Sequence, residues 1–293
     1  MAEAAAARGG VVTVPTWPLR RPDGLPVVMG VVNVTPDSFS DGGQWFEPAA
    51  AIEHGRELRA QGADILDVGG ESTRPGAERP PVEEELRRVL PVIEALVAQG
   101  AVVSVDTMRA SVARAALAAG AALVNDVSGG LADEAMAGVV AEAGVPFVTM
   151  HWRGHSADMQ SRAAYHDVVA EVCAELSGRA KSLVAQGIPA DRLILDPGFG
   201  FAKLAEHNWA LLRHLDRVLD LGHPVLVGTS RKAFLGRVGV GPDAQSRPPL
   251  DRDVATAATS MYAATAGVWG VRVHEVTSTL DAMRVARAIE EAV

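Results

Sequence analysis

Polar side chains follow eight short apolar runs along the chain, at the point where each run ends. They include Asn33, Asp67, Asp106, Asn125, His151, Asp196, Lys232 and Arg272. One such residue could be an ordinary helix N-cap, and Asp106 before TMRASVARAAL fits that simpler role. Hydrogen-bonding groups at all eight ends are a poor match to capping alone. We therefore expect these side chains to converge on a single site.

Three of these residues carry groups that recognise a flat heterocycle. Asp106 and Asp196 supply carboxylates, and Asn125 supplies an amide. Such groups pair with the N–H and carbonyl edges of a guanidine-like ring. The set predicts a recognition edge for a planar, nitrogen-rich substrate.

A second set is basic and suits a phosphate-bearing leaving group. Its members are Arg74, Arg231, Lys232, Arg272 and His274. Asn33 adds a hard oxygen ligand that could share a divalent ion with the phosphate. Alternation along residues 271–274 places Arg272 and His274 on one face of an otherwise apolar strand. The two basic residues of the SRK motif have a simpler alternative, a solvated loop.

Common catalytic signatures do not fit the chain. It contains neither GxGxxG nor GxxxxGK[ST], and GTSRK lacks the glycine that follows the serine in GxSxG. His274 and Glu275 begin like HExxH, but the fifth position is Ser278. Dinucleotide, P-loop, nucleophile-elbow and zincin sites are therefore not predicted.

Two long segments rich in Gly, Pro and Ser, residues 35–43 and 71–80, are too polar to pack in a core. We expect them to act as mobile lids over the site. Phe39 and Pro75 could cover a flat co-substrate, although an ordinary exposed loop residue is an equal alternative for each.

The elements that must position these groups alternate between short strands and longer helices. Strands are predicted at Val27–Val32, Ile65–Val68, Val102–Val105, Leu123–Asn125, Phe147–Met150, Leu193–Leu195, Val225–Val227 and Val271–Val273. Helices are predicted at Pro48–Ala60, Glu83–Gln99, Ala110–Ala119, Glu134–Ala143, His166–Gln186, Leu204–Leu215, Asp253–Ala266 and Ser278–Ala292. Continuous apolar runs are typical of parallel strands covered on both faces by helices. The pattern predicts an α/β protein with a (β/α)₈ TIM barrel, and a doubly wound open sheet is the second possibility.

Composition excludes several classes of protein. The 293 residues are 48% hydrophobic, which is enough for a large core and excludes intrinsic disorder. The 27 basic and 36 acidic residues give a formal charge of −9, and no run of five like charges occurs. Binding to nucleic acid is not expected, and the aromatic content of 4% also argues against platforms for stacked bases.

The single cysteine and the first residues of the chain indicate the cellular compartment of the protein. Cys173 stands alone, so the chain can build neither a disulfide framework nor a thiolate metal cluster. The first residues show no signal-peptide pattern, and no apolar stretch reaches membrane-spanning length. We expect a cytoplasmic protein without a membrane segment, with a flexible extension over residues 1–25 and one barrel domain over residues 26–293.

Seven motifs, taken together, resemble those of the dihydropteroate synthase family. They are VMGVVNVTPDSFSDGG, ILDVGGESTRPGA, VSVDT, VNDVSGG, LDPGFGFAK, VGTSRKAFLG and GVRVHEV. The resemblance runs in order from about Val27 to the carboxyl terminus. It implies a TIM barrel that joins 7,8-dihydropterin-6-ylmethyl diphosphate to 4-aminobenzoate, releasing diphosphate and forming 7,8-dihydropteroate for folate synthesis. It further implies Mg²⁺, dissociative C–O cleavage and a homodimer formed through barrel helices opposite the site.

The resemblance also implies roles for particular residues. The pterin-contacting set is Asp106, Asn125, Met150, Asp196 and Lys232. The diphosphate set is Asn33, Arg74, Arg272 and His274, with Asn33 as the Mg²⁺ ligand. The 4-aminobenzoate set, where sulfonamides compete, is Phe39, Ser72, Thr73, Arg74, Pro75 and Phe201. Catalysis is expected to rest on Asp106, Asp196, Lys232, Arg272 and His274.

Two alternatives keep the pterin edge but change the function. A methyltetrahydrofolate:corrinoid methyltransferase would need neither ESTRPG nor SRK, both of which this chain carries. A non-catalytic paralogue would be expected to lose lid or phosphate residues, which are retained. One departure from the family stands at Ala233, where some members carry a serine that can contact 4-aminobenzoate.

Overall fold

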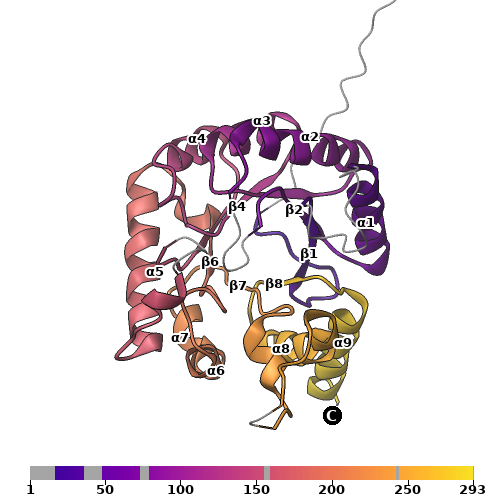
Figure 1. Ribbon diagram of the computed structural model, residues 1–293, viewed down its shortest axis with the longest axis vertical. Coiled ribbons are helices and arrows are strands. Elements are labelled where there is room, and N and C mark those ends of the chain that lie inside the picture. Colours follow the sequence, from indigo (N-terminus) through magenta and orange to yellow (C-terminus); the bar gives the residue numbers. More distant parts are fainter. Residues whose placement is uncertain (1–16, 36–47, 73–78, 155–158, 242–243, 293) are drawn as a thin grey trace, which may run out of the picture.

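The computed structural model describes residues 17–35, 48–72, 79–154, 159–241 and 244–292 (Figure 1). The described residues form eight strands. They are β1 Val27–Asn33, β2 Ile65–Gly69, β3 Val103–Asp106, β4 Leu123–Asp126, β5 Phe147–Met150, β6 Leu193–Asp196, β7 Leu226–Val227 and β8 Gly270–Val273. Each lies within a residue or so of the predicted run.

These strands form one parallel sheet in the order β6-β5-β4-β3-β2-β1-β8-β7. The two edges meet where Leu195 bridges Val225 in parallel and the Leu195 N–H donates to the carbonyl of Pro224 at 2.8 Å. An open doubly wound sheet would leave its edge strands apart. The (β/α)₈ barrel prediction is therefore confirmed, with helices around the outside of the strands (Figure 1).

Helices follow the strands as predicted. They are α1 Pro48–Gln61, α2 Val82–Ala98, α3 Ala110–Ala118, α4 Met136–Ala143, α5 Val168–Ala185, α6 Ala205–Arg213, α7 Leu215–Leu219, α8 Asp253–Thr265 and α9 Thr277–Glu290. Short 3₁₀ turns occur at Met159–Arg162, Ala190–Arg192, Ala233–Arg237 and Pro249–Arg252. The single helix predicted over Leu204–Leu215 is wrong, because His214 leaves the helical region with φ −112° and ψ 38° and separates α6 from α7. Within the described ranges, no helix is both long and apolar enough to cross a bilayer.

Packing divides the barrel interior into an apolar floor and a polar mouth. The floor is a buried cluster from the amino-terminal parts of the strands, namely Val27, Met29, Ile65, Leu123, Val148, Ile194 and Leu226. A larger apolar cluster fills the space between the strands and the helices. Since side chains alternate along a strand, inward positions beyond the floor fall at the carboxyl ends, where the polar residues stand.

Part of the stretch ahead of β1, within residues 17–25, packs against this floor. Trp17 and Leu19 lie against the floor cluster, and the rings of Trp17 and Trp269 are 5.9 Å apart. The indole N–H of Trp269 donates to the carbonyl of Leu19 at 2.9 Å. Apolar burial thus ties this stretch to the barrel, which composition alone did not indicate. The boundary at residue 26 stays a prediction, because residues 1–16 lie outside the described part.

Candidate active site

Strand register brings the predicted recognition edge together at the barrel mouth. Asp106 on β3 pairs with Gly69 on β2 and with Asn125 on β4. A Cβ at position 69 would lie 3.3 Å from the Cβ of Asp106, so a glycine there leaves room for the carboxylate. Asp106 is not a helix cap, because the first N–H of α3, at Ala110, is bonded by Asp133 instead.

Arg272 on β8 joins this edge by bridging two carboxylates. Its Nε donates to Asp67 Oδ2 at 2.6 Å, and its Nη2 donates to Asp106 Oδ2 at 2.7 Å. Asp67 Oδ2 also accepts from Asn125 Nδ2 at 2.9 Å. Residues from β2, β3, β4 and β8 therefore form one hydrogen-bonded cluster, which we call the Arg272 cluster: Asp67, Asp106, Asn125 and Arg272.

Charge in the Arg272 cluster is unbalanced, because one guanidinium faces two carboxylates. Burial raises the pKa of Asp106 above its ordinary value, Arg272 opposes the rise, and Asp67 adds to it. Burial also lowers the pKa of Arg272, but Asp67 and Asp106 outweigh it and the pKa ends above its ordinary value. Arg272 consequently stays charged, while Asp106 takes up a proton more readily than an exposed aspartate.

Asp196 faces the Arg272 cluster from β6. Its Oδ1 accepts the Gly198 N–H at 2.7 Å. Burial raises the pKa of Asp196, and Lys232 is the strongest of the charges that oppose the rise. A Cβ at Gly228 would lie 3.8 Å from both the Cβ of Arg272 and Asp196 Oδ2. Asp196 and Arg272 thus flank Gly228, which carries no side chain to separate them.

Lys232 reaches the mouth across the segment that follows β6. Its ammonium donates to the carbonyl of Phe199 and lies 4.5 Å from the ring centroid of Phe201. Burial lowers the pKa of Lys232 to about 8, although Asp196 raises it. Gly200 has φ +77°, and a Cβ there would come within 2.8 Å of the Lys232 side chain. Glycine at 200 is therefore required both by the backbone and by the passing lysine.

The three residues of the SRK motif, Ser230, Arg231 and Lys232, have different partners. Ser230 Oγ accepts the His274 backbone N–H at 3.1 Å and lies 2.9 Å from His274 Nδ1. Arg231 instead forms a two-point ion pair with Asp253, with both distances 2.7 Å. In this arrangement the Arg231 guanidinium faces the start of α8. That Arg231 serves a phosphate group stays a prediction.

Other predicted residues are placed as follows. Met150 is buried at the end of β5, where it pairs with Asp196. Asn33 ends β1 beside Gly69, and its side chain makes no hydrogen bond with another described residue. Ser72 is partly buried just beyond β2. Four predicted positions lie outside the described residues, namely Phe39, Thr73, Arg74 and Pro75.

Three functional candidates have no role that the sequence predicts. Asp67 stands at a strand end, but no feature of the sequence indicates that it shares Arg272 with Asp106. His151 and Lys203 form a buried pair with Lys203 Nζ 2.9 Å from His151 Nδ1. Lys203 stands seven positions beyond Asp196, so inspection of strand ends could not find it. The sequence signal that could indicate a role for Lys203 is its place inside the LDPGFGFAK motif.

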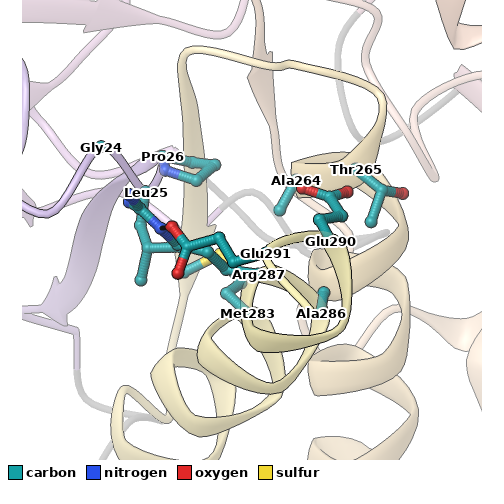
Figure 2. Close-up of a pocket in the computed structure, with 10 residues that line it drawn as sticks. All are labelled: Gly24, Leu25, Pro26, Ala264, Thr265, Met283, Ala286, Arg287, Glu290 and Glu291. Atoms are coloured by element: carbon teal, nitrogen blue, oxygen red, sulfur yellow. Dashed lines mark hydrogen bonds and ion pairs between the residues drawn. The ribbon is translucent and has the colours of Figure 1, made fainter. Parts of the chain in front are cut away.

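A separate pocket of about 280 Å³ lies at the other end of the barrel (Figure 2). It is lined by Gly24, Leu25 and Pro26 ahead of β1 and by residues near the ends of α8 and α9. Its Arg287 is paired with Glu291 at 2.6 Å. No predicted site residue lines this pocket, which therefore does not belong to the site at the mouth.

Comparisons with known proteins agree with this geometry. Residues 29–274 match the model of a family described as pterin binding enzyme. The chain is 55% identical over 262 residues to a Mycobacterium leprae dihydropteroate synthase, covering 89% of this chain and 92% of that one. Xanthomonas albilineans dihydropteroate synthase with 4-aminobenzoic acid superposes with a TM-score of 0.84 at 47% identity, covering 92% and 94% of the two chains. Its complex with 7,8-dihydropteroate gives a TM-score of 0.81 at 44% identity, covering 92% and 95%. The resemblance carried by the motifs is thus confirmed, and the chain belongs to the dihydropteroate synthase family of pterin-binding enzymes, which are transferases.

Proposed function

We propose that this chain joins 7,8-dihydropterin-6-ylmethyl diphosphate to 4-aminobenzoate at the barrel mouth, giving 7,8-dihydropteroate and diphosphate. The observation that carries the proposal is the Arg272 cluster with Asp196 and Lys232 beside it. It combines hydrogen-bonding groups for a pterin with cations for a departing anion. The solved relatives with 4-aminobenzoic acid, one substrate, and with 7,8-dihydropteroate, the product, support the same reaction.

In this proposal the pterin ring is held at its N–H and carbonyl edges. Asp106, Asn125 and Asp196 are the groups that pair with it, and Met150 supplies an apolar wall. The C–O bond between the exocyclic methylene and the diphosphate breaks first, and both electrons leave with the diphosphate. The carboxylates then stabilise positive charge that develops on the dihydropterin, in a buried setting where such interactions are strong.

The departing diphosphate is held by the basic groups of the last strand. Arg272 and His274 are the residues proposed to contact it, and Arg272 remains charged because two carboxylates raise its pKa. Ser230 Oγ accepts the His274 backbone N–H, and in this proposal the Ser230 O–H donates to Nδ1 of His274. Nε2 of His274 then carries the ring hydrogen and donates to the diphosphate.

Mg²⁺ fits the residues present as an ion shared with the substrate. Asn33 offers one hard oxygen at the mouth, and the described residues contain no group of three His, Cys, Asp or Glu side chains able to hold a metal. A Mg²⁺ ion commonly binds through few protein ligands and takes the rest from phosphate and water. When bound, it would neutralise charge on the diphosphate.

The amine of 4-aminobenzoate completes the reaction. Its nitrogen lone pair forms the new C–N bond at the exocyclic methylene, and the nitrogen then transfers one proton to water. Phe201, whose ring lies against Lys232, and Ser72 are the described residues proposed to line this side of the site. No serine or cysteine nucleophile is required, because the electron-rich pterin itself supports bond cleavage.

The proposal includes a homodimer and a cytoplasmic location. Helices α8 and α9 pack side by side (Figure 1) and expose large apolar side chains. These are Val254, Tyr262, Val285 and Ile289, which are 47% to 79% exposed. A second copy of the chain that packed on α8 and α9 would bury these side chains, which supports dimerisation through these helices. The lone cysteine is in keeping with a reducing compartment.

The test is to incubate purified protein with the pterin diphosphate, 4-aminobenzoate and Mg²⁺ and to measure 7,8-dihydropteroate. A parallel reaction contains a chelator in place of Mg²⁺. We expect product with Mg²⁺ and a large loss of rate without it. Absence of product under conditions where a control synthase is active would contradict the proposal and favour a non-catalytic binding protein.

A further inference from the structure

A buried lysine lies directly behind the pterin site, and the proposed mechanism does not use it. Lys203 and His151 are each only 3% exposed. Lys203 Nζ donates to the carbonyl of Phe201 at 3.2 Å and lies 2.9 Å from His151 Nδ1. Position 198 lies next to it, since a Cβ on Gly198 would be 3.3 Å from both Lys203 Nζ and Met150 Cγ. Lys203 therefore lies beside Gly198, close to Met150, which is proposed to form the apolar wall of the pterin site.

Lys203, His151 and Glu175 are hydrogen-bonded in a row, and the Glu175 carboxylate sets the direction of the bonds. His151 Nε2 lies 2.9 Å from Glu175 Oε2, and an ionised carboxylate can only accept, so Nε2 carries the proton. Burial lowers the pKa of His151 to about 4, which keeps the ring neutral. Its Nδ1 must then accept from Lys203. The result is one oriented chain of donors from Lys203 through His151 to Glu175.

The segment that Lys203 holds has a strained backbone. Gly198, Gly200 and Ala202 have φ of +71°, +77° and +47°. The two glycines adopt a positive φ without steric cost, whereas at Ala202 this conformation is strained and persists only where the surroundings fix it. Two further anchors exist on the same segment: Tyr165 donates its hydroxyl to the Ala202 carbonyl at 3.0 Å, and Asn208 accepts the Gly200 N–H at 2.7 Å.

The same segment forms the contacts of Lys232. The Phe199 carbonyl accepts from the Lys232 ammonium, and the Phe201 ring lies 4.5 Å from it. We propose that Lys203, held by His151 and Glu175, is a positioning residue that fixes Phe199 and Phe201 against Lys232 and thereby shapes the boundary between the pterin and 4-aminobenzoate sites. This inference rests on the proposed function and deepens it.

The decisive variant is Lys203→Met, which keeps the length and apolar stem of the side chain but removes its donors. Its matched control is Lys181→Met, the same change at an exposed lysine of α5. We expect Lys203→Met to lower kcat/KM for 4-aminobenzoate by about tenfold or more through loss of a donor that orients the segment. The dissociation constant of the pterin diphosphate alone should change less, because Asp106 and Asn125 are untouched and only the Asp196 and Lys232 side of that site borders the segment. Lys181→Met should match wild type.

A second variant keeps the inference open to disproof if Lys203→Met does not fold. Tyr165→Phe removes only the hydroxyl that holds Ala202, and we expect a rise of about threefold in KM for 4-aminobenzoate, the scale of one neutral hydrogen bond. A buried lysine that only supported the fold would lower the melting temperature and leave these kinetic parameters unchanged. A wild-type kcat/KM for 4-aminobenzoate in folded Lys203→Met would overturn the inference. If Lys203→Met does not fold, a wild-type KM for 4-aminobenzoate in Tyr165→Phe would overturn it. Absence of product from wild-type protein would instead overturn the proposed function.

Discussion

Arg272 and Asp106 form an ion pair across the barrel mouth, with Nη2 2.7 Å from Oδ2, although 166 positions separate them in the chain. The same guanidinium reaches Asp67 at 2.6 Å. A residue proposed to bind the diphosphate and one proposed to bind the pterin are thus directly connected. The two halves of the substrate would be held by one cluster and not by two separate pockets.

The first prediction concerns Asp106→Asn, which preserves the shape of the side chain and removes its charge. We expect turnover to fall at least tenfold, about 1.4 kcal/mol of lost transition-state stabilisation. The fold should be retained, because Arg272 keeps its bond to Asp67. Steady-state kinetics with circular dichroism checks both points. Wild-type turnover in the folded variant would contradict the role of Asp106.

The second prediction concerns Arg272→Ala, which removes the counterion of Asp67, which is fully buried, and of Asp106, which is mostly buried. We expect loss of turnover together with destabilisation of about 3–5 kcal/mol, the usual cost of stranding a buried charge. Denaturant unfolding measures the second effect. Arg213→Ala, at an exposed arginine of α6, is the control and should leave the free energy of unfolding unchanged. Equal stability of the two variants would show that the Arg272 cluster does not depend on this cation.

The third prediction concerns residues 17–25, at the floor of the barrel and away from the mouth. Trp17 packs on Trp269, and Arg21 pairs with Asp64 at 2.7 Å. Trp17→Ala should lower the free energy of unfolding by about 1–3 kcal/mol, less than for a fully buried aromatic residue. Activity per folded molecule should not change, because the site is at the other end. Arg20→Ala, at an exposed neighbour, serves as the control, and equal stability of the two would mean that this stretch is loose.

The fourth prediction concerns the pH dependence of stability. Burial lowers the pKa of Lys203 from an ordinary value of 10.5 to about 7. Between these values the unfolded chain binds more protons than the native one, so this lysine makes stability rise with pH and lowers it as pH falls. Lys203→Met should reduce the slope of unfolding free energy against pH in this window, by up to about 1.4 kcal/mol per pH unit. Denaturant unfolding at several pH values checks this, and the same slope in Lys203→Met and Lys181→Met would refute it.

The sequence predicted the barrel and much of the site because both follow from local rules. Continuous apolar runs indicate buried parallel strands, and their carboxyl ends meet at one mouth, so Asp106, Asn125 and Asp196 could be selected together. Alternation placed Arg272 inside the barrel. Each of these inferences needs only the residue type and its place on a strand.

Relationships between distant side chains could not be predicted in this way. Arg231 pairs with Asp253, which lies 22 positions away in the chain and outside the SRK motif. Asp67 and Lys203 acquire their roles from Arg272 and His151, which lie on other strands or beyond them. The packing of Trp17 on Trp269 likewise depends on the closed barrel bringing the first and last strands together.

A crystal structure of the wild-type protein with 7,8-dihydropteroate tests the central claim most directly. We expect the pterin ring at the barrel mouth, within hydrogen-bonding distance of Asp106, Asn125 and Asp196, and the aminobenzoate portion of the ligand toward Phe201. A ring bound elsewhere, or one without contact to these three side chains, would contradict the proposed function.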